Sequence, residues 1–118
     1  MEKHLFDSEW KLMELIWENA PICAKDVAVL AAEALNWNKN TTYTVLKKLV
    51  DKGVLRRDEP NFICMPLLQR KDAQKTETKL LIDKLYHGSK KAFFAAFLED
   101  EQLSSEEIDH LRQLIERK

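Results

Sequence analysis

The sequence has little glycine and proline, with two glycines and three prolines among 118 residues. Both residue types mark turns and helix ends, so their scarcity predicts a mostly helical chain with short connections. No apolar run approaches the roughly 20 residues that a membrane-spanning helix needs, and we expect no membrane insertion. The first residues lack the basic start and apolar run of a secretory signal, so the cytoplasm is the expected compartment.

Cysteine and histidine are also scarce, and their spacing argues against the usual metal and redox frameworks. Cys23 and Cys64 form neither a disulfide framework nor a metal-ligand pattern, and we expect them to be small buried side chains. His4, His87 and His110 are far apart in the sequence. The chain also lacks a glycine-rich phosphate loop, a His-Glu-x-x-His pair and a nucleophile elbow. We therefore expect no metal, no cofactor and no enzymatic activity.

The charge of the chain is balanced overall but uneven along the sequence. The 19 Lys and Arg residues against 20 Asp and Glu residues give a net charge of −1, which by itself does not indicate a nucleic-acid binder. Between residues 39 and 57, however, six basic residues stand against one acidic residue, a local net charge of +5. Such a cluster is expected of a surface that contacts phosphates. On charge alone, a solvated helix face that happens to be basic explains the cluster as well.

The period of the apolar residues predicts three helices in the first half of the chain. The first begins at a cap supplied by Asp7 and ends near residues 19–21. The second covers residues 24–35. The third runs from a cap at Asn38 to Gly53, where a left-handed residue can end a helix.

A different pattern follows the third helix. Residues 54–57 and 62–66 are short β-type runs that flank a turn sequence at residues 58–61. Three helices followed by a hairpin is the layout of a winged helix-turn-helix domain, in which the third helix enters the major groove and the hairpin, or wing, lies along the backbone or minor groove. We assign this domain to residues 1–72.

The third helix and the wing carry the candidate DNA contacts. Short hydroxyl and amide side chains can reach base edges, and the expected base-proximal residues are Asn40, Thr41, Tyr43 and Thr44. Basic side chains meet phosphates, and the expected phosphate contacts are Lys39, Lys47, Lys48, Arg56 and Arg57. For Lys48, one turn after Thr44, pairing with an acid is the alternative.

From about residue 70 the helical pattern returns in three segments, which are broken at Gly88 and opened again by a capping box at Ser104. Residues 73–118 are too few to bury their own apolar stripes, so a dimerisation domain is expected. A dimer would also deliver two recognition helices to a two-fold symmetric operator. The residues expected in the dimer face are Leu81, Leu85, Phe94, Phe97, Leu98, Ile108, Leu111, Leu114 and Ile115. The alternative is that these helices fold back onto the N-terminal domain as one monomeric core.

Several segments together resemble the penicillinase and methicillin-resistance repressor family. Residues 6–17 resemble its SxxEWxVMxxxW opening, and Trp37 through Leu49 resemble its WxxKTxxTxLxRLxxKG recognition segment. Residues 66–67 and 103–108 match as well, so the resemblance covers nearly the whole chain. It implies a cytoplasmic bacterial repressor of resistance or sensor operons, with a winged helix and a helical dimerisation domain, that binds inverted-repeat operators.

The resemblance also bears on individual DNA-contact residues. Thr41 and Thr44 match the family's threonines on the groove face, and Lys48 stands where arginine is more usual. Asn40 replaces a usual lysine, which removes one positive charge and can alter phosphate affinity or half-site preference. The tip of the predicted wing, residues 59–61, is less basic than is usual in the family.

The resemblance further implies that a sensor pathway, starting at a membrane sensor protease, releases the repressor by cleavage. In better-known members the cleaved bond follows an Asn and precedes a Phe in the second dimerisation helix. The aligned pair here is Ala96-Phe97, which is the candidate cleavage site. Copper-responsive relatives carry a cysteine-rich tail, whereas residues 112–118 contain no cysteine.

Two other functions stay open at this point. A winged helix can serve as a protein-interaction module without DNA, and that function predicts little dependence of binding on salt. A DNA-binding regulator can also answer to a small-molecule or metal effector instead of a protease. A sizeable pocket in the C-terminal domain would favour this second alternative.

Overall fold

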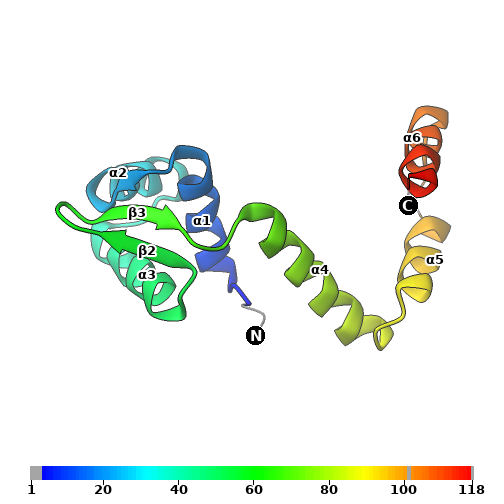
Figure 1. Cartoon of the computed structure of the whole chain (residues 1–118), viewed down its shortest axis with the longest axis horizontal. Helices are drawn as coiled ribbons and strands as arrows, with labels where there is room; N and C mark the ends of the chain where they lie inside the picture. Colours follow the sequence, from blue (N-terminus) through cyan, green and yellow to red (C-terminus); the bar gives the residue numbers. More distant parts are fainter. Residues whose placement is uncertain (1–3, 101, 118) are drawn as a thin grey trace. The chain divides into compact units, whose positions relative to one another are not determined.

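The computed structural model describes residues 4–100 and 102–117. The chain divides into two compact units, residues 1–79 and residues 80–118. The helices and strands, labelled in Figure 1, are α1 (Asp7–Asn19), β1 (Ile22–Cys23), α2 (Ala24–Leu35), α3 (Lys39–Lys52), β2 (Leu55–Asp58), β3 (Ile63–Pro66), α4 (Arg70–Tyr86), α5 (Lys90–Asp100) and α6 (Ser105–Glu116). The expected domain boundary after residue 72 lies within α4, which begins in the first unit and ends in the second.

The first unit has the predicted order of three helices and a hairpin, with one addition. β2 and β3 pair antiparallel, with Leu55 opposite Pro66 and Asp58 opposite Ile63. β1 joins the other edge of β3, so the sheet has three strands in the order β1-β3-β2. The mostly helical fold with a small β wing is confirmed. No strand was expected at residues 22–23, because two residues are too few to show the alternation of a strand.

The ends of α1 and α3 show how local sequence sets the helix boundaries. Asn38 caps α3, where its side-chain oxygen accepts the Thr41 N–H at 2.8 Å, and Gly53 ends the helix at φ 82°. Both were predicted. The prediction that Asp7 caps α1 was wrong: Phe6 is the cap residue, and its N–H donates to Glu9 Oε1 at 2.8 Å. The carboxylate of Glu9 reaches back to the Phe6 N–H, whereas Phe6 has no side-chain oxygen that could accept an N–H of the first turn.

A core of buried, mostly hydrophobic side chains joins the helices and the sheet of the first unit. Its fully buried members with the largest side chains are Leu12, Met13 and Ile16 of α1, Val27 of α2, Thr42, Leu46 and Leu49 of α3, and Val54, Leu55 and Cys64 around the hairpin. Cys64 is buried as expected, whereas Cys23 is half-buried. Burial raises the pKa of the Cys64 thiol from 9.0 to about 11. This core fixes the orientation of α3 relative to the wing.

The start of α4 belongs to this first unit. The Trp17 indole N–H donates to the Leu68 carbonyl at 2.9 Å, and Arg70 donates to Glu14 Oε2 at 2.9 Å. Ala73 is 1% exposed and lies in the same core. These contacts show why the compact unit extends beyond residue 72.

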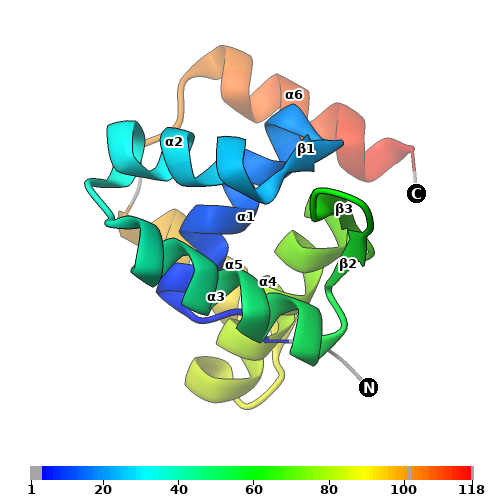
Figure 2. The same cartoon turned by 90° about the vertical axis from the view of Figure 1, so that its left-hand side faces the viewer.

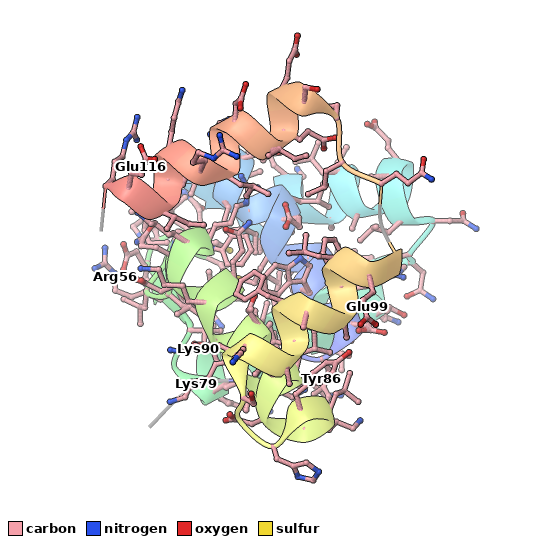
Figure 3. All side chains as sticks on the ribbon, turned by 90° about the vertical axis from the view of Figure 1, so that its right-hand side faces the viewer. Arg56, Lys79, Tyr86, Lys90, Glu99 and Glu116 are labelled. Atoms are coloured by element: carbon pink, nitrogen blue, oxygen red, sulfur yellow. The ribbon has the colours of Figure 1, made fainter. Side chains whose placement is uncertain are left out.

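The second unit consists of the end of α4 together with α5 and α6 (Figure 3). Tyr86 and Phe93 meet edge to face with ring centroids 5.7 Å apart. The predicted capping box of α6 is present: Ser104 Oγ accepts the Glu107 N–H at 3.1 Å, and the Ser104 N–H donates to Glu107 Oε1 at 3.0 Å. These hydrogen bonds hold the pKa of Glu107 below its usual value. α6 nevertheless buries none of its residues.

Candidate nucleic-acid interface

The solvent-facing edge of α3 gathers the short polar and basic side chains. Asn40, Thr44 and Lys47 follow one another at spacings of four and three residues, so they lie along one line of the helix. Thr41 and Lys48 flank this line, and all five side chains are exposed. Their opposite face, with Val45, Leu46 and Leu49, is buried. The core therefore turns the predicted contact residues outward. The helix itself lies beside the β2–β3 hairpin (Figure 2).

Hydrogen bonds within α3 limit what its hydroxyls can do. The Thr44 hydroxyl donates to the Asn40 carbonyl at 2.9 Å, so its proton is used inside the helix. The Thr44 side chain is nevertheless exposed, and a threonine methyl suits contact with a thymine methyl. Thr42 lies on the buried side and donates to the Asn38 carbonyl at 3.3 Å.

Tyr43 has a different environment from the other three predicted base-proximal residues. Its side chain is half-buried and packs against the core. The ring meets Phe62 of the wing edge to face, with centroids 6.3 Å apart, and the Lys39 ammonium lies 5.8 Å from the ring centre. Tyr43 thus joins α3 to the wing, and a base contact by its hydroxyl stays a prediction.

The two wing arginines already have carboxylate partners. Arg56 binds Asp58 with two parallel hydrogen bonds, in which Nε donates to Oδ1 at 2.8 Å and Nη2 donates to Oδ2 at 3.0 Å. This pairing raises the pKa of Arg56 above its usual value, through the hydrogen bond first and the charge second. Arg57 donates to Glu59 Oε1 through Nε alone, and its guanidinium lies 4.1 Å from the centre of the Phe62 ring. Neither pair was predicted from the sequence, although Arg56 and Asp58 lie two apart in a strand and therefore share a face.

A groove separates α3 from the wing. It has a volume of about 340 Å³, and its lining residues are Tyr43, Lys47, Val50, Asp51, Arg57 and Phe62. Two predicted phosphate contacts, Lys47 and Arg57, therefore lie on opposite walls of one groove. Aromatic side chains form part of the lining, and such rings can pack against sugars or stacked groups.

One lysine counted in the basic cluster faces away from this surface. Lys52 Nζ lies 2.6 Å from Glu9 Oε1 and donates to the His4 carbonyl at 2.9 Å. The ammonium also lies 4.7 Å from the centre of the Phe6 ring. Glu9 is only 2% exposed, so this pair compensates a buried carboxylate. Lys52 therefore links α3 to the start of α1. Without Lys52, the contact surface is less basic than the local net charge of residues 39–57 indicates.

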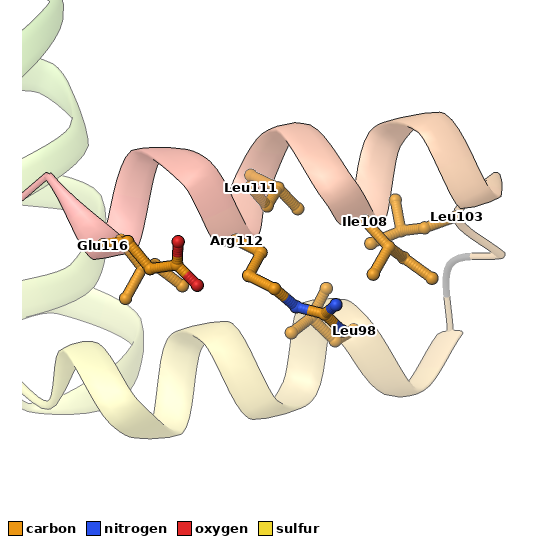
Figure 4. A pocket seen from close by; sticks show the side chains of 7 residues that line it. Leu98, Leu103, Ile108, Leu111, Arg112 and Glu116 are labelled. Carbon is orange, nitrogen blue, oxygen red and sulfur yellow. The ribbon is translucent and has the colours of Figure 1, made fainter.

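The second unit presents the predicted dimer residues to solvent. All nine are exposed in the single chain, by 42% for Leu114 to 72% for Ile115. An apolar groove of about 540 Å³ lies along α5 and α6, as the close view in Figure 4 shows, and its lining residues are Leu98, Leu103, Ile108, Leu111, Arg112, Ile115 and Glu116. Ala96 and Phe97 lie within α5, where Ala96 is half-buried and Phe97 is 49% exposed.

Metal-ligating and membrane-spanning features are absent from the parts of the chain that the structure describes. Residues 4–100 and 102–117 contain no group of three or more His, Cys, Asp or Glu residues that could hold a metal ion. Within the same ranges, no helix has the length and apolar content to cross a membrane.

Comparisons with known proteins agree with this arrangement. A family model described as penicillinase repressor matches residues 5–117. The penicillinase repressor of Bacillus licheniformis is 29% identical over 112 residues, which cover 93% of this chain and 88% of that protein. The methicillin resistance regulatory protein MecI of Staphylococcus aureus (strain N315) is 28% identical over 113 residues, which cover 94% and 92%.

A solved structure adds a DNA complex to these comparisons. It is the solution structure of the monomeric form of Bacillus licheniformis BlaI in complex with the blaP half-operator. The match has a TM-score of 0.51 and 25% identity, and covers 58% of this chain and 87% of that chain. The names of these relatives describe repressors and a regulatory protein.

Proposed function

The chain belongs to the penicillinase repressor family and is a DNA-binding transcriptional repressor, and we propose that it binds an inverted-repeat operator as a homodimer. The observation that carries this proposal is the exposed polar edge of α3, which a buried core holds beside the wing groove. A helix presented in this way fits the major groove, and the hairpin then lies against the backbone. As a DNA-binding protein it would act in the cytoplasm, on resistance or sensor operons.

On this proposal the α3 edge divides into base readers and phosphate contacts. Asn40, Thr41 and Thr44 reach base edges, Tyr43 lies close to them, and Asn40 can bond an adenine with both amide atoms. Lys39, Lys47 and Lys48 contact phosphates on either side, and Lys47 does so together with Arg57 across the groove. Arg56 joins them from the exposed side of β2.

The homodimer is supported by the exposed apolar residues of the second unit. Contiguous apolar surface of this kind marks an interaction site in a protein that is stable in water. The α5–α6 groove has the chemistry to receive leucine and isoleucine side chains from the same face of a second copy. The BlaI structure pairs a monomeric form with a half-operator. Two copies of the present chain would accordingly cover the two halves of an inverted repeat.

The experiment for this proposal measures binding to DNA duplexes of different symmetry. An inverted repeat recovered by selection with the full chain is compared with its isolated half-site and with a random duplex. We expect tightest binding to the inverted repeat, and log K that falls with log salt by about 0.9 per phosphate contacted. Binding that ignores salt, or no binding to any selected duplex, would favour a protein-interaction module instead.

We further propose that cleavage of the Ala96–Phe97 bond, under a membrane sensor protease pathway, releases the repressor. Hydrolysis there would separate the winged helix from most of the apolar face, since six of the nine predicted dimer residues follow this bond: Phe97, Leu98, Ile108, Leu111, Leu114 and Ile115. A protease needs extended backbone, and a helix with so few buried side chains opens locally at low cost. Mass spectrometry of the chain from induced cells should show a fragment that ends at Ala96. An intact chain under full induction would contradict this.

The α5–α6 groove also favours a second candidate, a small-molecule effector. Its lining is apolar, with Arg112 and Glu116 as the charged members. The two candidates differ in how the groove responds to protein concentration. If a second copy fills the groove, a fluorescent apolar dye should bind less per chain as the protein dimerises. If the groove serves an effector, dye binding per chain should not change with dimerisation.

A further inference from the structure

The wing contains two arginine–carboxylate pairs whose side chains are about half exposed. In the Arg56–Asp58 pair the side chains are 55% and 40% exposed, and in the Arg57–Glu59 pair 51% and 59%. Pairs exposed to this degree are weak and exchange readily, because water competes for both partners. The pairs contribute little to the stability of the fold. Their main effect is to lower the net positive charge of the wing.

The geometry of the first pair is that of a phosphate contact. A guanidinium binds a carboxylate and a phosphate with the same planar fork of N–H donors. In the free chain both donors of the Arg56 fork, Nε and Nη2, are taken by Asp58. A DNA phosphate that takes both of these donors must displace the carboxylate.

The second pair is held more firmly in place. The Arg57 guanidinium lies against the Phe62 ring, while Glu59 bonds Arg57 and also accepts the Phe62 N–H at 3.4 Å. Arg57 thus stays on the wall of the groove that Lys47 lines from α3. Across the wing the two positive charges are balanced by two negative ones, and neither pair includes Lys47 or Lys48 of α3.

We propose that Asp58 and Glu59 are internal counter-ions which DNA phosphates displace, and that they lower the affinity of the chain for non-specific DNA. A loosely held duplex would meet a wing without net charge. A duplex seated on α3 in the correct register would bring phosphates close enough to replace the carboxylates. The two acids would thereby act as specificity-determining residues. This inference rests on the proposed DNA-binding function.

The test compares charge-neutralised variants of the full chain. Asp58→Asn and Glu59→Gln are each titrated against a random duplex and against the selected inverted repeat. On the random duplex we expect affinity to rise by roughly threefold to tenfold, with a salt slope steeper by about 0.9 for each arginine released. On the inverted repeat the gain should be smaller, so the ratio of specific to non-specific affinity should fall.

Two controls separate the release of an arginine from a simple change of charge. Asp51→Asn removes one negative charge from the α3 wall of the same groove, and Asp51 takes part in neither arginine pair. Its effect should be smaller than that of Asp58→Asn. In an Arg56→Gln background, Asp58→Asn should gain no more than Asp51→Asn does in the wild-type chain. Equal effects of Asp51→Asn and Asp58→Asn in the wild-type chain would overturn the proposal.

The same titrations distinguish the two possible failures. If the wild-type chain binds none of the duplexes, the proposed function itself fails. If the wild-type chain binds the inverted repeat with the expected salt dependence while the wing variants behave as the Asp51 control, only the role of the wing acids fails. Because Asp51, Arg56 and Glu59 are exposed and Asp58 is half-buried outside the core, the variants should unfold close to the wild-type temperature, which circular dichroism checks.

Discussion

The two units of this chain treat their large apolar side chains in opposite ways. Of residues 4–79, the strongly exposed large hydrophobic residues are Phe6, Val29 and Leu67, while a core of leucine, isoleucine and methionine is almost fully buried. Among the described residues from 80 onwards nine are exposed, although the helices there are well formed and α6 has a complete capping box. A segment can therefore carry the local sequence features that form a helix without burying the apolar side chains of that helix in the same chain. A helix without a core of its own gains most of its stability from a packing partner.

The largest effect is expected from a charge that is placed in the exposed apolar face of the second unit. Leu111→Asp should abolish the dimer and lower operator affinity by orders of magnitude, because a buried unpaired carboxylate costs several kcal/mol. Sedimentation and operator titration measure both effects. The matched control is Gln113→Asp, which adds the same charge to the same helix outside the nine apolar positions. Equal behaviour of the two variants would show that the apolar face does not assemble the protein.

Two substitutions in the first unit should remove contacts with bases and leave the dimer intact. Thr41→Ala and Thr44→Ala should each weaken operator binding by about 1 to 3 kcal/mol while random duplexes bind nearly as before. Both variants should still sediment as the wild-type chain does. Loss of affinity that is the same on operator and random DNA would show that these threonines do not read bases.

A phosphate contact should have a smaller and less selective effect. Lys47→Ala should weaken binding to all duplexes alike and lower the salt slope by about 0.9, the share of one phosphate. Titration over a range of salt concentrations measures this slope. An unchanged slope would remove Lys47 from the phosphate contacts and leave the groove between α3 and the wing without that role.

The buried core of the first unit predicts a modest dependence of stability on alkaline pH. The pKa of Cys64 rises from 9.0 to about 11 in the folded chain, so the unfolded chain loses this proton first as pH increases. The contribution of Cys64 to the free energy of unfolding should be complete below pH 9 and decline towards pH 11. Chemical denaturation of the wild-type chain and of Cys64→Ala checks this, since groups other than Cys64 titrate in both. A parallel decline in the two proteins would contradict it.

Features with a local cause could be predicted from the sequence. The Asn38 cap, the end of α3 at Gly53 and the hairpin follow from signals within a few residues, and the structure confirms them. The exposed face of α3 follows from its apolar period in the same way. The pairing of Arg56 with Asp58 also has a local cause, since alternate strand residues share a face, and attention to this spacing would have found it.

Features that depend on distant residues could not be predicted. Lys52 was counted with the basic surface, yet its partner Glu9 lies 43 positions away in the sequence and meets it only in the fold. Tyr43 was grouped with the base-proximal residues, and its contact with Phe62 likewise depends on how the wing packs on α3. No period or spacing signal reports such tertiary contacts. The single sequence therefore overstates the basic surface.

On the proposed function, the first unit contacts DNA and the second unit holds two copies of the chain together. Sedimentation of the full chain and of residues 1–79 at micromolar concentration, with and without the inverted repeat, distinguishes these two roles. We predict that the full chain sediments as a dimer, and that residues 1–79 sediment as a folded monomer whose affinity for the inverted repeat is lower by about 10²-fold to 10⁴-fold, because avidity is lost. A full chain that sediments as a monomer, or a shortened chain that binds the inverted repeat as tightly as the full chain does, would show that the second unit does not assemble the repressor.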